Sequence, residues 1–430
     1  MPPSPTPPAN DILVRKYGGS SLATVERIRD VARDICAQRA AGYQMVIVVS
    51  AMGQTTNELA ELARQVNPAP PRRELDMLLS VGERITMSLL SMALAAEGCS
   101  AISYTGSQCA IITDTSHTNA RIKEVKGDRV RQSLAAGHVV VVAGFQGVSE
   151  TKEITTLGRG GSDTTAVALA AALGASRCEI LKDVDGVMTA DPARLPAARR
   201  HETLSYRELE DMAVSGCGVV HHRAVRYAAK HGVPLFVGSS FNPGPGTHID
   251  PGPDGISPIT IPDHTVTAPT ATTTRFAPAF RPLAMIVTDP VAWLELVGEN
   301  GELLPRWVET LTSQVKLAEC LSEWWSETPD CRWGVLGDSA YLTTLHADAE
   351  AFATDSDWRI RFRPELGCIT LVGGRQGSWL FARQTLAALL LQQGIEPWWL
   401  QVDGPALRLL IPAGSLSRLL DPLHAAFWPA

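Results

Sequence analysis

Three glycine-containing loops carry most of the side chains that could do chemistry in this sequence. They read KYGGSS at 16–21, SAMGQTTNEL at 50–59 and TTLGRGGSD at 155–163, and each follows a segment typical of a buried strand. Glycine lets backbone N–H groups approach an anion, and the start of a following helix adds favourable electrostatic potential. The three loops therefore predict a site for a phosphate-containing ligand.

The charged side chains around these loops suit the transfer of a phosphoryl group. Lys16 could neutralise a phosphate whose charge moves during transfer, and Arg159 could hold a carboxylate through two parallel hydrogen bonds. Asp163 could hold a lysine or a metal, and Glu83, in SVGERI, could bind a substrate ammonium group. Phosphoryl transfer needs positioning and charge neutralisation more than covalent chemistry, so the combination favours a kinase.

Each signal has an ordinary structural explanation when it is taken alone. KYGGSS could be a plain turn between a strand and a helix, and the hydroxyls of Ser50, Thr55 and Thr56 could be helix N-caps. Glu83 could be a partner of the helix dipole. Neither the P-loop pattern nor GxGxxG is present, so the prediction depends on the three loops together.

Alternating strands and helices from residue 12 to about 240 must position these loops. ILVRKYGG, MVIVVSAMG, HVVVVAGFQG, CEILKDVDG and PLFVGSS read as strands, and their continuous apolar runs are typical of a parallel sheet covered on both faces. Helices are expected at 74–97, after Asp163, and at 24–40, where Val25, Ile28, Val31, Ile35 and Cys36 share a face. The pattern predicts an α/β sandwich with functional loops at the carboxyl ends of its strands.

The remainder of the chain differs in composition and in pattern. Residues 241–282 are crowded with Pro, Gly and Thr, and two strand–helix–strand–strand–helix units follow, with helices expected at about 304–325 and 377–393. We therefore expect a proline-rich disordered tail at 1–11, a catalytic domain at 12–250, a linker at 251–282 and two α+β modules at 283–355 and 356–430.

Composition limits the classes of protein to which this chain could belong. The 430 residues are 45% hydrophobic and 19% charged, as in a globular protein, and the formal charge of −7 gives no sign of nucleic-acid binding. Eight cysteines without a CxxC pair fit a reducing cytosol. No secretory signal and no apolar run of membrane-spanning length is evident, so a cytoplasmic protein without nucleic-acid or membrane partners is expected.

Eight motifs together resemble the aspartokinases of the amino-acid-kinase superfamily. They are VRKYGGSSLATVERI, VVSAMGQTTNELAELA, LLSVGERI, ARI, GFQGV, TTLGRGGSDTTAVALAAALGA, DVDGVMTADP and FVGSS. The resemblance covers residues 12–250 and implies phosphorylation of L-aspartate, or a similar small amino acid, by ATP with Mg. The C-terminal repeat occupies the place of that family's paired ACT regulatory domains, which implies an amino-acid-kinase-type α/β/α sandwich followed by ACT-like modules, and a homo-oligomer formed through them.

The resemblance also implies a role for individual residues. Lys16 would stabilise the transferring phosphoryl group and Asp163 would orient it, so both are assigned as catalytic. The residues assigned to substrate binding are Ser50, Thr56, Glu83, Arg159 and Ser162. The residues assigned to nucleotide binding are Gly18, Gly19, Ser20, Gly160, Gly161, Lys182, Asp183, Met188 and Val219. No metal-binding residue is assigned.

The nucleotide side departs from the family pattern at four positions. The family usually has Ser or Thr, Tyr, Arg and Lys where this chain has Lys182, Met188, Ala193 and Gly218. Two cations expected near the phosphates are therefore replaced, and Lys182 and Arg194 are possible substitutes. In the regulatory half, ENGELLP at 299–305 stands where the family often has a DKPG-like effector turn.

Three functions remain open at this point. The chain could be an aspartate kinase, specialised and with lost or altered feedback control, or it could use ATP to join aspartate or another small carboxylate to an amine. It could also be a weakly catalytic or non-catalytic regulatory subunit. His221, His222 and His231 lack the spacing of zinc ligands, which favours a solvated or helix-packing role.

Overall fold

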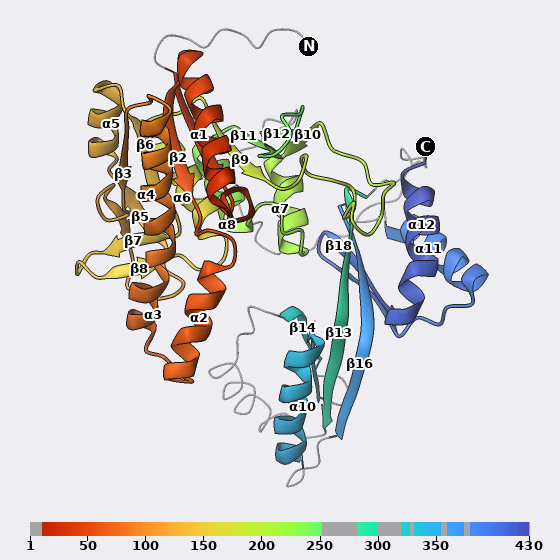
Figure 1. Cartoon of the computed structure of the whole chain (residues 1–430). Helices are drawn as coiled ribbons and strands as arrows, with labels where there is room; N and C mark the ends of the chain where they lie inside the picture. Colours follow the sequence, from red (N-terminus) through yellow and green to blue (C-terminus); the bar gives the residue numbers. More distant parts are fainter. Residues whose placement is uncertain are drawn as a thin grey trace, which may run out of the picture. The chain divides into compact units, whose positions relative to one another are not determined.

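The computed structural model describes residues 11–251, 282–298, 320–326, 331–353, 359–373 and 379–429, which form two compact units (Figure 1). Among these residues, the first unit comprises 11–187, 200–213 and 218–251. The second comprises 188–199, 214–217 and the part from 282 onward. Almost all of the tail expected at 1–11 and of the linker expected at 251–282 lies outside the described residues.

An eight-stranded sheet forms the centre of the first unit. Its order is β10 (Thr203–Ser205), β12 (Thr247–Asp250), β11 (Leu235–Ser239), β9 (Arg177–Lys182), β1 (Ile12–Tyr17), β2 (Gln44–Val49), β6 (Val139–Ala143) and β3 (Ala101–Tyr104). All neighbouring pairs from β11 to β3 run parallel, and only β12 is antiparallel to its neighbour β11. The strands expected from the apolar runs are confirmed.

Helices cover both faces of this sheet (Figure 1). The described helices of this unit are α1 (Val25–Ala40), α2 (Thr55–Val66), α3 (Arg72–Leu79), α4 (Val81–Ala96), α5 (Asp128–Ala135), α6 (Gly161–Leu173), α7 (Tyr206–Val214) and α8 (His222–His231), with a short 3-10 turn η1 (Ser20–Leu22). Helices α1 and α4 pack on each other, and α6 packs on α8, β1, β2 and β9. The α/β/α sandwich expected from the sequence is confirmed.

The alternation of side chains along β1 determines which residues face the site. Leu13 and Tyr17 belong to the core cluster that includes residues of α1 and α4. Lys16 lies between them in the alternation and so points to the opposite face, where α6 packs on β1. Lys16 pairs with Val48 of β2 and Ile180 of β9, so it occupies the middle of the sheet near its carboxyl edge.

Two of the expected helices differ in detail. Val25 lies outside the buried face of α1 because its side chain is 49% exposed, whereas Ile28, Val31 and Ile35 are buried as expected. The helix expected at 74–97 is divided at Ser80 into α3 and α4. Residues 72–96 together are long and apolar enough to cross a membrane by composition alone. However, Leu90 and Leu94 are fully buried in the core of the first unit, so we assign this segment to that core.

A small four-stranded sheet, which the sequence did not reveal, leads into α6. Its order is β5 (Ile122–Val125), β4 (Ile111–Thr113), β7 (Gln146–Ser149) and β8 (Ile154–Thr156). Because β8 ends just before the loop that contains Arg159, this sheet determines where that loop starts.

The second unit contains one six-stranded antiparallel sheet. Its order is β14 (Cys320–Ser326), β15 (Cys331–Asp338), β13 (Ala284–Gly298), β16 (Arg359–Val372), β18 (Ala406–Pro412) and β17 (Trp399–Asp403). The helical elements are α10 (Ser339–Ala353), α11 (Trp379–Gln393), the 3-10 turn η3 (Ala413–Ser415) and α12 (Leu416–Phe427). Strand β16, α11, β17, β18 and α12 follow the expected order of the second module.

The helix expected at about 304–325 is wrong over its last residues. Residues 304–319 lie outside the described part of the chain, and 320–326 form strand β14, paired antiparallel with β15. The segment CLSEWWS contains two adjacent tryptophans, and aromatic residues favour strands. The apolar spacing alone did not distinguish the two structures.

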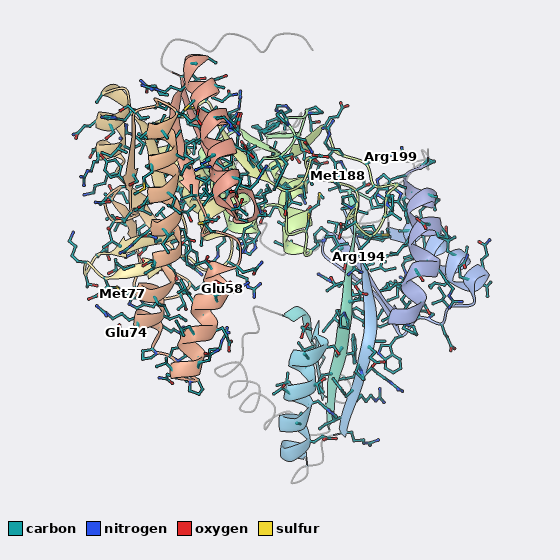
Figure 2. The ribbon with its side chains drawn as sticks, viewed as in Figure 1. Glu58, Glu74, Met77, Met188, Arg194 and Arg199 are labelled. Carbon is teal, nitrogen blue, oxygen red and sulfur yellow. The ribbon has the colours of Figure 1, made fainter. Side chains whose placement is uncertain are left out.

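Residues 188–199 belong to the second unit although they lie within the catalytic part of the sequence. Ala190 and Leu195 are buried in the same apolar cluster as Leu371 and Leu423. Thr189 Oγ1 lies 3.1 Å from His424 Nε2. Figure 2 labels Met188, Arg194 and Arg199 in this segment. The DVDG turn after β9 is therefore followed directly by a segment that folds with the C-terminal core.

Candidate active site

Two lysines share one buried aspartate at the carboxyl edge of the central sheet. Lys16 Nζ, at the end of β1, lies 2.7 Å from Asp163 Oδ1, and Lys182 Nζ, at the end of β9, lies 3.4 Å from Asp163 Oδ2. Lys182 Nζ is also 3.5 Å from the carbonyl oxygen of Gly218. The Lys16 and Asp163 side chains are almost completely buried, while that of Lys182 is 19% exposed. The group carries a net positive charge and is suited to bind an anion.

The start of α6 brings Asp163 to this position. Gly160 has a φ of +69°, a left-handed conformation that L side chains rarely adopt, and it precedes the first helical residue. A Cβ atom built on Gly160 would lie 2.1 Å from the side chain of His221. His221 accepts a hydrogen bond from the Arg223 N–H at Nδ1 and so caps α8. Gly160 is therefore required both for the turn and for the contact between α6 and α8.

The charged groups set each other's protonation. Burial opposes the ionisation of Asp163, but the Lys16 and Lys182 ammonium groups outweigh it and hold the Asp163 pKa at about 2. Burial lowers the pKa of Lys16, whereas Asp163 opposes that effect and Lys182 adds to it. With an ionised carboxylate between two lysines, Asp163 is arranged to hold cations and is a poor proton acceptor at neutral pH.

Glu83 offers a second charged group on the same unit. It lies in the first turn of α4, is 3% exposed, and accepts a hydrogen bond from the Ala51 N–H at Oε1 over 3.2 Å. Its other oxygen, Oε2, is buried and has no hydrogen-bond partner among the described residues. Burial raises the Glu83 pKa to about 7, while the backbone N–H groups and the Lys16 charge oppose that rise. An ammonium group would satisfy Oε2 and favour the ionised form.

Backbone segments from neighbouring strands come very close together around these side chains. The Gly18 N–H donates to the Leu181 carbonyl over 3.2 Å, and the Gly53 N–H donates to the Gly19 carbonyl over 3.1 Å. A Cβ on Gly19 would lie 2.9 Å from the Ala51 carbonyl oxygen. Glycine at 19 therefore allows the first and second loops to meet at the carboxyl edge of the sheet.

Comparison with known proteins identifies the family of this fold and site. The sequence matches the amino acid kinase family over residues 11–239, which is more than half of the chain. The chain belongs to the amino acid kinase family. Aspartokinases of Mycolicibacterium smegmatis and Corynebacterium glutamicum are 54% and 55% identical to it over 239 residues. Each alignment covers 55% of this chain and 57% of the relative, so the chain matches little more than half the length of these relatives.

Solved structures extend the similarity of this amino acid kinase to both units. The aspartate kinase from Synechocystis is 32% identical, with a TM-score of 0.52, over 97% of this chain and 69% of that one. E. coli aspartokinase III, solved with aspartate and ADP, has a TM-score of 0.72 over 96% of this chain and 99% of that one. Its identity is 21%, so this second likeness shows the fold alone. The resemblance and the fold class expected from the sequence are confirmed.

The other residues assigned to substrate binding lie on the three loops of the kinase unit. Ser50 directly follows β2, and Thr56 is in the first turn of α2; both are half-buried. Arg159 is exposed in the loop between β8 and α6, and Ser162 is buried at the start of α6. A Cβ on Gly144 would lie 2.8 Å from Ser162 Oγ, which shows how closely the loop after β6 approaches α6. Their binding roles stay predictions.

The residues assigned to nucleotide binding differ in their exposure and in the unit to which they belong. Gly161, like Gly160, belongs to the start of α6, and Ser20 is exposed at the start of η1. Asp183 is exposed directly after β9, and Val219 follows Gly218 in the first unit. Met188 is grouped with the second unit.

Of the two cations proposed to replace those missing from the family pattern, Lys182 lies beside Asp163 within the first unit. Lys182 contacts Asp163 and Gly218, as described above. Arg194 forms an ion pair with Asp289 of the second unit. Arg194 is therefore engaged within the second unit, and the phosphate-binding role of Lys182 stays a prediction.

Phe145 supports the site but received no role from the sequence. It has a φ of +67°, its N–H donates to Thr165 Oγ1 over 3.2 Å, and its carbonyl accepts the Leu157 N–H over 2.9 Å. A Cβ on Gly161 would lie 2.8 Å from the Phe145 ring. The GFQGV motif after a buried strand was the available signal, because Phe145 follows the glycine of that motif.

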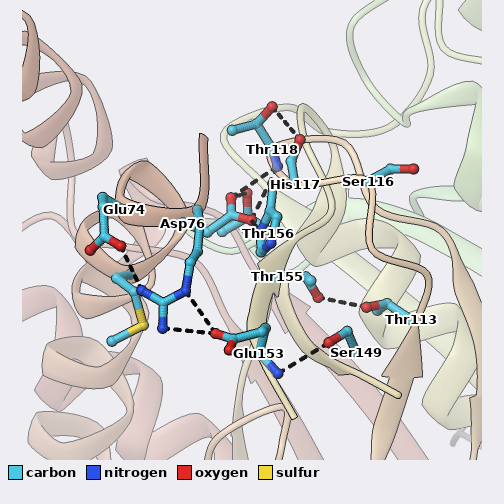
Figure 3. A network of polar contacts seen from close by, with 12 residues as sticks. Glu74, Asp76, Thr113, Ser116, His117, Thr118, Ser149, Glu153, Thr155 and Thr156 are labelled. Carbon is cyan, nitrogen blue, oxygen red and sulfur yellow. Dashed lines mark hydrogen bonds and ion pairs between the residues drawn. The ribbon is translucent and has the colours of Figure 1, made fainter. Parts of the chain in front are cut away.

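A buried acid on α3, Asp76, fixes the entrance to the Arg159 loop (Figure 3). Asp76 is fully buried, accepts the Thr118 N–H at 3.0 and 3.1 Å, and accepts the Thr156 hydroxyl at 2.5 Å. His117 Nδ1 lies 2.7 Å from the same carboxylate. Thr156 ends β8, three positions before Arg159. Asp76 thus holds the start of the Arg159 loop in place. Among the described contacts, it makes none with the charged residues of the proposed site.

Proposed function

We propose that this chain transfers the terminal phosphoryl group of ATP to the side-chain carboxylate of L-aspartate, giving 4-phospho-L-aspartate and ADP. The observation that carries the proposal is the buried Lys16–Asp163 pair with Lys182 on its other oxygen, at the edge where three glycine loops meet. Glu83, which offers an unpartnered oxygen close enough for Lys16 to influence its pKa, favours an amino acid as the acceptor. The aspartokinase names of the relatives support the same choice.

The reaction needs charge stabilisation and no proton transfer. One oxygen of the aspartate side-chain carboxylate attacks the γ-phosphorus, and the bond between that phosphorus and the bridging oxygen of ADP breaks. The electron pair of the broken bond stays on the ADP phosphate, and the attacking carboxylate is already ionised at neutral pH. Lys16 stabilises the charge on the transferring group, and Asp163 holds Lys16 and Lys182 in place. An Asp163 pKa of about 2 suits this positioning role.

The acceptor amino acid would be held by groups of opposite charge at its two ends. Arg159 binds the α-carboxylate, and Glu83 Oε2 binds the ammonium group. Ser50, Thr56 and Ser162 supply hydroxyls that complete the pocket. Holding the acceptor in line with the phosphoryl group is the other large contribution to such a reaction.

Magnesium fits this site as part of the nucleotide substrate. No group of three or more potential metal-ligating side chains occurs among the described residues, and both Asp163 oxygens face lysines. Mg²⁺ commonly binds phosphate oxygens and water with few protein ligands. We therefore propose that Mg²⁺ arrives as MgATP and partly neutralises the phosphates, while the lysines supply the remaining positive charge.

The proposed reaction is tested by trapping its product. The purified full chain is incubated with MgATP, L-aspartate and hydroxylamine, and the aspartyl hydroxamate formed from the acyl phosphate is measured. The proposal expects hydroxamate that depends on both ATP and aspartate. ADP release without hydroxamate, or no turnover at high enzyme concentration, would contradict it.

The raised pKa of Glu83 predicts that aspartate binding weakens as the pH falls. Below about pH 7 the Glu83 carboxyl of the free enzyme becomes protonated, and a neutral acid no longer attracts the substrate ammonium group. The KM for aspartate is expected to rise about tenfold for each pH unit below 7, with kcat much less affected. Initial rates measured from pH 6 to 8 at saturating ATP check this.

The matched variant is Glu83→Gln, which keeps the shape of the side chain but does not ionise. It is expected to have a high KM for aspartate that is nearly constant between pH 6 and 8. A variant whose KM still rises as the pH falls would show that another group causes the dependence. Circular dichroism of both proteins over the same range verifies that the fold is retained.

The remaining parts of the proposal concern assembly and location. We propose a homo-oligomer formed through the C-terminal modules, because Leu380 and Leu391 of α11 expose 66% and 85% of their surface. The cytoplasmic location and the separate domain bounds at 12–250, 283–355 and 356–430 likewise stay predictions.

A further inference from the structure

A cavity of about 440 Å³ lies on the kinase unit, and none of the residues assigned to the proposed reaction lines it. Four basic residues contribute to its lining: Arg121, before β5, and Arg223, Arg226 and Lys230 of α8. Thr164 of α6 and Tyr227 of α8 add two hydroxyl groups. The lining contains no aspartate or glutamate. Its volume is within the range of small-molecule sites.

The acids nearest to these cations leave much of the positive charge unbalanced. Arg226 forms an ion pair with Glu210, whereas Asp114 Oδ1 accepts a hydrogen bond from the backbone N–H of Arg121, over 3.2 Å. Burial lowers the pKa of Arg223, and the Arg121 charge lowers it further, with Asp114 opposing. Burial, then Arg226 and Arg223, also lowers the pKa of His222, another lining residue. A bound anion would stabilise the charged forms of these side chains, which otherwise repel one another.

We propose that this cavity is a binding site for a small phosphorylated metabolite. Guanidinium groups match the planar edges of phosphate oxygens, and hydroxyl donors can satisfy the oxygens that remain. Four basic side chains exceed what one carboxylate needs, so the occupant carries at least two negative charges. The inference concerns a different site from the proposed reaction and does not depend on it.

The cavity is connected to the loop that carries Arg159. Arg223 Nη1 donates to the carbonyl oxygen of Leu157 over 3.2 Å, and Leu157 is two positions before Arg159. In the first turn of α6, Thr164 Oγ1 donates to the Gly160 carbonyl over 3.2 Å, and Thr164 directly follows Asp163. An occupant of the cavity contacts both ends of the segment 157–164, because Leu157 and Thr164 both line the cavity. We therefore expect it to change the KM for the amino-acid substrate more than kcat.

Calorimetric titration of the full chain with inorganic pyrophosphate tests the site. The double variant Arg226→Gln/Lys230→Gln removes two cations of the cavity. It leaves the hydrogen bond from Arg223 to the Leu157 carbonyl unchanged. It is expected to bind pyrophosphate at least about tenfold more weakly than the unaltered chain. The control Arg64→Gln/Lys126→Gln makes the same change of net charge at two exposed positions outside the cavity, and it is expected to bind as the unaltered chain does.

Two further titrations separate this cavity from the proposed ATP site and from other polyanions. Pyrophosphate binding that survives Arg226→Gln/Lys230→Gln but is lost in Lys182→Ser would assign the ligand to the ATP site and overturn the proposal. Absence of binding up to about 10 mM would overturn it as well. Citrate serves as a carboxylate probe, and equal affinity for citrate would contradict a phosphate site. Weaker citrate binding with pyrophosphate binding unchanged in Lys182→Ser supports the proposal.

Discussion

Replacing Lys16 with methionine is expected to lower kcat of the proposed aspartate kinase by about 10³-fold or more. Lys16 is the buried cation 2.7 Å from Asp163, and it can neutralise charge on the transferring phosphoryl group where water is largely excluded. Methionine keeps the linear apolar stem, so the surroundings of the side chain change little. The KM values for ATP and aspartate should change much less than kcat, because the lost interaction strengthens only in the transition state. Hydroxamate formation at saturating substrates measures the effect.

A double-mutant cycle with Asp163→Asn tests whether the two residues act as one unit. Asparagine keeps the shape of Asp163 but removes the charge that holds both lysines. If Asp163 acts by holding Lys16, then Lys16→Met/Asp163→Asn should lose little more activity than Lys16→Met alone. Fully additive losses would contradict this assignment and give Asp163 a separate role. Thermal unfolding of all three variants separates loss of activity from loss of fold.

The sequence predicted the features that depend on neighbouring residues. The continuous apolar runs predicted parallel strands buried on both faces, and Val46 to Val49 and Val139 to Val142 are indeed fully buried. A strand followed by a glycine loop and a helix also predicted where functional side chains gather, because the carboxyl ends of parallel strands share one edge of the sheet. Lys16 and Asp163 were therefore named together, although they are far apart along the chain.

Other features depend on contacts that local patterns do not reveal. Nothing in LDMLLS distinguishes Asp76 from a surface acid, because its partners Thr118 and Thr156 are distant in sequence. Arg194 lay close to the DVDG motif in sequence, yet its segment folds with the second unit, where Asp289 pairs with it. The helix expected at about 304–325 overlaps strand β14, whose structure depends on pairing with β15, a contact that the local pattern does not reveal.

The residues at positions 182 and 218 differ from the charge pattern that the family resemblance implies for the proposed ATP site. That pattern has a small hydroxyl residue at position 182 and a lysine at position 218, whereas this chain has Lys182 and Gly218. The two positions are adjacent in space, because Lys182 Nζ lies 3.5 Å from the Gly218 carbonyl oxygen. We infer that a cation missing from one loop is supplied by the end of β9, so that the ATP site keeps its charge.

Lys182→Ser is therefore expected to raise the KM for ATP by about 10- to 100-fold, the loss of one charge-assisted phosphate contact. The KM for aspartate should change far less, because Arg159 and Glu83 are proposed to hold that substrate. The exposed Lys126→Ser serves as the control for the loss of one lysine, and its KM for ATP should stay at the original value. Initial rates over a range of MgATP concentrations check both variants.

The decisive variant is Lys182→Ser/Gly218→Lys, which moves the lysine to the other loop. A Cβ at Gly218 meets no atom within 4 Å, and its backbone φ is not among the left-handed values, so a side chain can be added there without strain. Lys182 contacts both Asp163 and the Gly218 carbonyl, so a lysine at either position starts from the same part of the site. The double variant should therefore recover most of the ATP affinity that Lys182→Ser loses. Gly218→Lys alone should leave the KM for ATP the same or lower it. If the double variant bound ATP as weakly as Lys182→Ser does, Lys182 would act through Asp163 alone. The hypothesis that Lys182 replaces a lysine at position 218 would then be wrong.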